Sequence, residues 1–209
     1  LAVVFLEIGQ DVALSGKYVE DAVNDGVRQA YENFRKSSVH PLSRKNSGDN
    51  TPAIIHTRVV KGDKVKVSCM MKGFGSENMS RLFMLTPADG VEGVVEKVVE
   101  TVKDAGSCPC PPVILGVGVG GTMEKAAIMS KHALLNDLDK ENPDEYLSSL
   151  EKEMLEKINA LGIGAEGFRG DVTALRVFIE TENTHIAGLP VAVTVQCHCS
   201  RHGERIIEG

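Results

Sequence analysis

The cysteines of this chain lie mainly in two tight clusters, and their thiols are the side chains best suited to chemistry. One cluster, Cys108-Pro109-Cys110, is followed by two more prolines and an apolar, glycine-rich run. The other, Cys197-His198-Cys199, ends a second apolar run. The total of five cysteines is odd, which favours metal or catalytic use in a reducing compartment over a disulfide framework. The sequence therefore predicts a cytoplasmic metalloprotein.

The residues alone leave three interpretations of these clusters open. Cys108, Cys110, Cys197 and Cys199 could bind a structural zinc, although C-x-C is tighter than the usual zinc spacing. A smaller number of these thiolates could hold an iron–sulfur cluster and leave one iron open for chemistry. The thiols could also be inert and buried, as we expect for Cys69, which alternates with apolar residues in a strand.

The glycine-rich run at residues 116–122 lies between an expected strand and an expected helix, where phosphate-binding loops occur. Its spacing is not G-x-G-x-x-G, and no Lys-Ser/Thr pair marks a Walker loop. We therefore expect glycines that allow a strand and a helix to pack closely. A site for a substrate carboxylate and a nucleotide site are the alternatives.

Hydrophobic patterns predict the elements that must position these residues. Apolar runs indicate strands at residues 1–8, 53–60, 64–71, 113–119, 174–180 and 190–196. Helical spacing of apolar residues indicates helices at residues 18–34, 91–102, 122–135 and 142–161. The turn Lys61-Gly62-Asp63 predicts a hairpin between the second and third strands. Strands that alternate with helices predict a mixed α/β fold with one main domain over residues 1–209.

Composition excludes several classes of function. The chain has 209 residues, 42% of them hydrophobic, so a core can form without disulfides. It has 23 basic and 29 acidic residues and few aromatic ones, which argues against a nucleic-acid partner. No apolar run reaches the roughly 20 residues of a membrane span, and no signal peptide is visible. We expect no nucleic acid and no membrane among its partners.

The sequence resembles the α subunit of the iron–sulfur class I fumarases and the related L-tartrate dehydratases over nearly its whole length. The segments that carry the resemblance are Lys72-Gly-Phe-Gly-Ser-Glu-Asn78, Cys110-Pro-Pro112 with Gly120-Gly-Thr122, Leu161-Gly-Ile-Gly-Ala165, and His185 with its spacing to Cys197. They are specific in combination, whereas none would be specific by itself.

The resemblance implies the ligands of a [4Fe–4S] cluster. In that family three cysteines hold the cluster, and its fourth iron has no protein ligand. The second ligand corresponds to Cys110 and the third to Cys197, which leaves Cys108 and Cys199 as extra thiols one residue away. The first ligand belongs to a Cys-Gln-Asp-Thr-Gly segment that directly precedes the strand beginning here at Leu1, and that segment is absent from this sequence.

The resemblance also implies roles for other residues. Arg35 matches an arginine that grips a substrate carboxylate, whereas the residues alone indicate only a solvated charge near a helix C-terminus. Gly75 matches a glycine whose backbone approaches the substrate, and Phe74 departs from the three glycines common there. His185 matches an active-site histidine, although a single histidine is more often a surface or capping residue.

The activity implied is that of a hydro-lyase α subunit, which adds water reversibly to fumarate to give L-malate with the open iron as Lewis acid. L-tartrate is the alternative dicarboxylate substrate, and a zinc-stabilised binding module is the alternative from another class. The family's second half carries further site residues, so we expect a β subunit as partner, an α₂β₂ assembly, and no activity from this chain alone.

Overall fold

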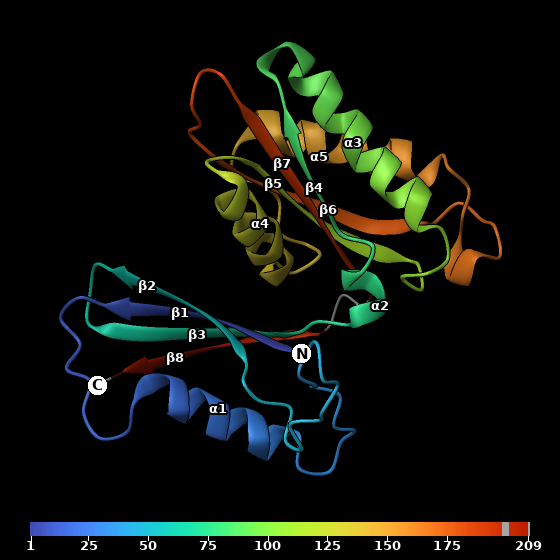
Figure 1. Cartoon of the computed structure of the whole chain (residues 1–209). Helices are drawn as coiled ribbons and strands as arrows, with labels where there is room; N and C mark the ends of the chain where they lie inside the picture. The colour runs from blue at the N-terminus through green and yellow to red at the C-terminus, as the bar shows by residue number, and fades with distance from the viewer. Residues whose placement is uncertain (198–200, 209) are drawn as a thin grey trace. The chain divides into compact units, whose positions relative to one another are not determined.

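The computed structural model describes residues 1–197 and 201–208, which form two compact units (Figure 1). The first unit consists of Leu1–Lys72 with Arg201–Gly209, and the second of Gly73–Ser200. Each unit combines a four-stranded sheet with one or more helices, so the predicted mixed α/β class is confirmed. Within the described residues, no helix is long and apolar enough to cross a membrane.

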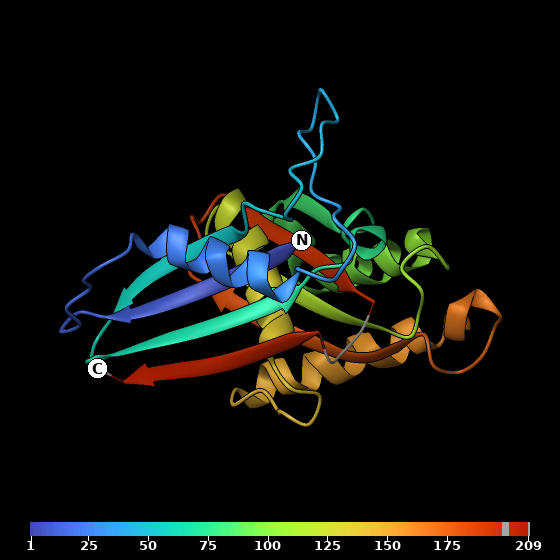
Figure 2. The same cartoon turned by 90° about the horizontal axis from the view of Figure 1, so that it is seen from below.

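The first unit has a four-stranded sheet in the order β2-β1-β3-β8. These strands are β1 (Ala2–Gly9), β2 (Ile54–Val60), β3 (Lys64–Met71) and β8 (His202–Glu208). Helix α1 (Val19–Ala30) lies along one face of this sheet, as Figure 2 shows. Its Val27 is buried with Val4 and Leu6 of β1, and Cys69 of β3 packs partly buried against the same core.

The predicted hairpin of the second and third strands is wrong, because β1 lies between them. Strand β1 pairs in parallel with β2 and antiparallel with β3. The turn that joins β2 to β3 therefore crosses the end of β1, where a Cβ on Gly9 would lie only 2.3 Å from the carbonyl oxygen of Gly62. The residues of β1 are buried on both faces, as a central strand requires.

The second unit has a four-stranded sheet in the order β4-β7-β5-β6. Its strands are β4 (Arg81–Leu85), β5 (Val113–Gly120), β6 (Ala174–Glu182) and β7 (Leu189–Gln196). Strands β5 and β6 are parallel, and the other pairs are antiparallel. Helices α3 (Gly90–Ala105) and α5 (Glu145–Asn159) cover one face and α4 (Met123–His132) the other (Figure 1).

Glycines of β5 allow α4 to pack directly on the strand. A Cβ on Gly116 would lie 1.9 Å from the carbonyl oxygen of Ser130, and one on Gly118 would lie 2.1 Å from that of Ala126. The buried hydroxyls of Ser130 and Thr194 also form a hydrogen bond of 2.7 Å between α4 and β7. The expectation of close strand–helix packing at this run is therefore confirmed.

One α-helix and two strands of the described residues were not predicted from the sequence. The expected polar loop at residues 72–78 contains the single-turn helix α2 (Phe74–Glu77). Strand β4 is only five residues long and β8 is exposed along most of its length, so neither has a clear buried periodicity. Both are edge strands, and their pairing depends on partners far away in the sequence.

Candidate functional site

The two predicted metal ligands lie at the same end of the sheet of the second unit. Strands β5 and β7 run antiparallel and pair Ile114 with Gln196. Cys110 shortly precedes the start of β5, and Cys197 directly follows the end of β7. The pairing therefore brings both cysteines to one end of the sheet, which we call the cysteine end.

Cys110 has an unusual backbone conformation. Its φ of 54° lies in the left-handed region, which few residues other than glycine adopt. Its N–H donates to the carbonyl of Ser107 at 3.0 Å, in a turn that also exposes Cys108. Cys110 is exposed and Cys197 half-buried, and both thiols are free. Backbone strain of this kind clusters at functional sites.

The segment between α5 and β6 supports this turn. The N–H of Glu166 donates to the carbonyl of Pro111 at 2.7 Å. A Cβ on Gly167, whose φ is +82°, would lie 2.4 Å from the Cβ of Ser107. The segment at residues 161–165 is thus followed directly by Glu166 and Gly167, which contact the cysteine turn. Sequence reasoning did not reveal these contacts.

Gly75 lies against the same turn. A Cβ on Gly75 would come within 3.5 Å of the carbonyl oxygen of Cys108. Just after α2, the hydroxyl of Ser80 accepts a hydrogen bond of 3.1 Å from the N–H of Val195, two residues before Cys197. The structure therefore places Gly75 against the turn that precedes β5, and Ser80 beside the end of β7.

The donor set at the cysteine end suits part of a thiolate metal site. Cysteine thiolates are the usual ligands of iron–sulfur clusters, and two free cysteines lie at this end of the sheet. The described residues contain no group of three histidine, cysteine or acidic side chains that could hold a metal ion. Cys199, a predicted alternative ligand, lies outside the described residues.

His185 lies at the opposite end of the same sheet. It belongs to the turn between β6 and β7, and its Nδ1 accepts a hydrogen bond of 3.2 Å from the N–H of Ala187. The eight residues of β7 separate this turn from Cys197, a span of about 26 Å at the usual rise of a strand. The structure therefore does not bring His185 together with Cys110 and Cys197 of its own unit.

An apolar pocket of about 420 Å³ lies beside His185. It is bordered by α3, α5 and the β6–β7 turn, with Val94, Leu150 and Ile179 among its lining residues. Neither lysine nor arginine lines this pocket within the described part of the chain. It therefore lacks the cations that a dicarboxylate would require.

The alternative of an anion site at the glycine-rich run is not supported by the groups at the N-terminus of α4. The Glu124 carboxylate lies there, and its hydrogen bond from the Thr122 hydroxyl lowers the pKa of that carboxyl group. The carbonyl of Gly121 accepts a hydrogen bond of 2.8 Å from the hydroxyl of Thr184. An acidic side chain of the protein thus occupies the position that an anion would take.

Arg35 belongs to the first unit and follows the C-terminal end of α1. Its side chain is exposed, and no described residue forms a hydrogen bond or ion pair with its guanidinium. Its backbone carbonyl, in contrast, accepts a hydrogen bond of 2.9 Å from the side chain of Asn50. Sequence reasoning did not identify Asn50, although its Gly-Asp-Asn-Thr-Pro context indicates a turn.

A known family matches this chain over nearly its whole length. The model of the family described as fumarate hydratase (Fumerase) matches residues 1–206. The chain belongs to this family. The resemblance inferred from the cysteine, glycine and histidine segments is therefore confirmed.

Two relatives illustrate the family. The chain is 43% identical over 215 residues to the putative L(+)-tartrate dehydratase subunit alpha of Methanocaldococcus jannaschii, with 99% of this chain and 75% of the relative covered. It is 30% identical over 210 residues to the L(+)-tartrate dehydratase subunit alpha of Escherichia coli O157:H7, with 97% and 69% covered. The names of both relatives describe them as alpha subunits.

Proposed function

We propose that this chain is the α subunit of an iron–sulfur hydro-lyase that hydrates fumarate reversibly to L-malate. The observation that supports this most directly is the position of Cys110 and Cys197 at the same end of one sheet. These are the two cysteines that the family's motifs single out as ligands. Gly75, the proposed contact of the substrate with the backbone, lies against the same turn.

The proposed cofactor is a [4Fe–4S] cluster held in part by the thiolates of Cys110 and Cys197. We propose that its third protein ligand lies outside the described residues. When bound, the cluster supplies an open iron that acts as Lewis acid toward the hydroxyl group gained or lost by the substrate. Both thiols must lose their protons to act as ligands, and the exposure of Cys110 gives the cofactor access.

Arg35 is proposed to bind a substrate carboxylate. A planar guanidinium can donate two parallel hydrogen bonds to a carboxylate, which fixes the orientation of the substrate as well as its charge. Binding one carboxylate in this way would hold the double bond in place for hydration. The exposed, unpaired guanidinium of Arg35 in the described structure is suited to that role.

His185 is proposed to orient the substrate or to polarise its carboxylate. Its hydrogen bond from Ala187 engages Nδ1, so the neutral ring carries its proton on Nε2, where it can donate to a carboxylate. About the length of β7 separates His185 from Cys197. His185 therefore cannot contact a substrate at the cysteine end of its own unit, and it can have this role only at another site.

The proposed partner is the β subunit of the same enzyme, in an α₂β₂ assembly. The names of the relatives support a multi-subunit enzyme, because each is an alpha subunit. The same names favour L-tartrate as a second candidate substrate. Fumarate and L-tartrate are both C4 dicarboxylates, and Arg35 is proposed to bind a carboxylate of either one.

The test uses the chain co-expressed with its β partner and reconstituted anaerobically with iron and sulfide. Turnover of fumarate and of L-tartrate is compared before and after exposure to air. Oxygen-sensitive turnover of fumarate in preference to L-tartrate would support the proposal, and the opposite preference would favour the second candidate. A content of about one zinc per chain, with no cluster absorbance and no turnover, would contradict both hydro-lyase candidates and favour the zinc-stabilised binding module.

A further inference from the structure

We propose that Asn50 is a positioning residue for Arg35, holding its backbone so that the guanidinium faces the substrate carboxylate. This inference rests on the proposed function, in which Arg35 binds that carboxylate. Asn50 is 4% exposed, so its amide must form its hydrogen bonds within the protein.

The side chain of Asn50 holds the segment that follows α1 at three points. Its Nδ2 donates to the carbonyl of Arg35 at 2.9 Å. Its Oδ1 accepts from the N–H of Ser37 at 2.6 Å and from the N–H of Ser38 at 3.2 Å. One buried amide thus fixes the peptide groups on the C-terminal side of Arg35, while the Arg35 side chain extends freely.

The position of Asn50 favours asparagine for two reasons. Its φ of 64° lies in the left-handed region, where asparagine is among the few side chains accepted readily. The three hydrogen bonds also require one donor and one acceptor at the tip of a short side chain, which asparagine supplies. Aspartate would keep the shape and the acceptor but would lack the donor that binds the Arg35 carbonyl.

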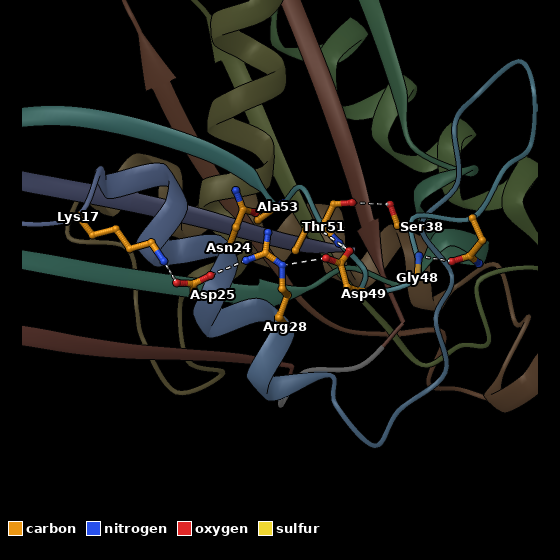
Figure 3. Close-up of polar contacts among 10 residues, drawn as sticks. Lys17, Asn24, Asp25, Arg28, Ser38, Gly48, Asp49, Thr51 and Ala53 are labelled. Atoms are coloured by element: carbon orange, nitrogen blue, oxygen red, sulfur yellow. Dashed lines mark hydrogen bonds and ion pairs between the residues drawn. The ribbon is translucent and has the colours of Figure 1, made fainter.

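The neighbours of Asn50 are tied back to α1, as Figure 3 shows. Arg28 of α1 donates from Nε to Asp49 at 2.8 Å. Asp49 in turn accepts from the N–H of Thr51 at 3.0 Å and from its hydroxyl at 2.7 Å. The residues on both sides of Asn50 are therefore attached to the same helix that precedes Arg35.

The N-terminal side of Arg35 is held as well. The ammonium group of Lys36 donates to the carbonyls of Glu32 and Phe34, both at 2.9 Å, in the turn that ends α1. The backbone around Arg35 is thus bonded on both sides, whereas its guanidinium has no partner among the described residues. A fixed backbone reduces the entropy that Arg35 loses when it binds a carboxylate.

The test compares Asn50→Asp with wild type in the reconstituted α–β complex. The substitution keeps both acceptor contacts and places a carboxylate oxygen against the Arg35 carbonyl in place of the donor. Loss of one hydrogen bond predicts a KM for the dicarboxylate about three- to tenfold higher, with a much smaller change in kcat. At acidic pH the introduced carboxyl group can donate again, so the rise in KM should diminish.

Two control variants separate positioning from charge. Ser43→Asp adds the same charge in the same loop at an exposed side chain. We expect it to leave KM within about twofold of wild type. Asn50→Gly is uncharged and accepts the left-handed backbone, so it should raise KM at least as much as Asn50→Asp. It should also speed hydrogen exchange at the amides of Ser37 and Ser38.

A double-mutant cycle with Arg35→Gln tests whether Asn50 acts through Arg35. If it does, Asn50→Asp should have little further effect on KM once the guanidinium is gone. Equal effects in both backgrounds, or an equal rise in KM with Ser43→Asp, would overturn the inference while leaving the role of Arg35 intact. If Arg35→Gln leaves KM unchanged, the proposed carboxylate contact fails and the inference fails with it.

Discussion

Ile114 of β5 pairs with Gln196 of β7, and this pairing places Cys110 and Cys197 at one end of the sheet. Neither cysteine belongs to a strand, so both can adopt the backbone that a ligand requires while the strands fix their positions. Cys110 has a left-handed backbone conformation, which a residue inside a strand would not have. A metal site on such turns is positioned by rigid elements without constraining the sheet itself.

The first prediction concerns the thiols. Cys110→Ser and Cys197→Ser in the reconstituted α–β complex should each remove most of the iron and lower turnover more than tenfold, roughly, because a hydroxyl is a poor ligand for this cofactor. Iron per α chain and cluster absorbance measure the effect. Cys69→Ser is the matched control, because this thiol packs partly buried against the core of the first unit. Equal iron loss in Cys108→Ser and Cys110→Ser would contradict the assigned ligand pair.

The second prediction concerns the contact between Gly167 and Ser107, which supports the cysteine turn. Gly167→Ala places a Cβ 2.4 Å from that of Ser107 at a positive φ, whereas Gly162→Ala has a positive φ but nothing within 4 Å. Both variants carry a backbone cost of about 1–2 kcal/mol. Gly167→Ala should lose a further 1–3 kcal/mol, roughly, from overpacking. Urea unfolding of the two variants gives the difference, and equal stabilities would show that the contact with Ser107 relaxes freely.

The third prediction separates His185 from the metal ligands. His185→Asn should leave the iron content of the reconstituted complex unchanged, because His185 lies beyond the far end of β7 from Cys197. If His185 contributes to the reaction, kcat should still fall by about a hundredfold or more, the usual size of an effect from a side chain that takes part in proton transfer or polarisation. Loss of iron in this variant would mean that His185 lies near the cluster after all.

Local patterns in the sequence predict the cysteine end well. The apolar runs of β5 and β7 are visible as strands, and the cysteines stand at their ends. The glycines of β5 predict the close contact with α4 because only residues without a Cβ fit there. What the sequence does not determine is strand order, and so the turn at Gly62 suggested a hairpin where β1 lies between the two strands.

Positioning residues are the other feature that local patterns do not reveal. Asn50 is one polar residue in a polar loop, and its role depends on the carbonyl of Arg35, fifteen residues away. Glu166 supports the cysteine turn through its backbone N–H, which any residue except proline has. Both contacts depend on how two loops meet, and only the three-dimensional structure contains that information.

The fourth prediction concerns the pH dependence of the loop that carries Asn50. Hydrogen bonds from the hydroxyl and N–H of Thr51, together with Arg28, lower the pKa of Asp49 below the usual value of 3.8 for an aspartate. A lowered pKa in the folded state means that Asp49 stabilises the protein at pH values above 3.8, and that this contribution is lost as the pH falls through the folded-state pKa. Asp49→Asn should therefore lower Tm near neutral pH.

The difference in Tm between wild type and Asp49→Asn should shrink as the pH is lowered below about 4, because wild type then loses the same interaction by protonation. Thermal unfolding from pH 7 to pH 3 measures it. Asp11→Asn is the control, since the Asp11 carboxylate is exposed and forms no hydrogen bond or ion pair with another described residue. A Tm difference for Asp49→Asn that stays constant over this range would show that its carboxylate is not held by Thr51 and Arg28 in solution.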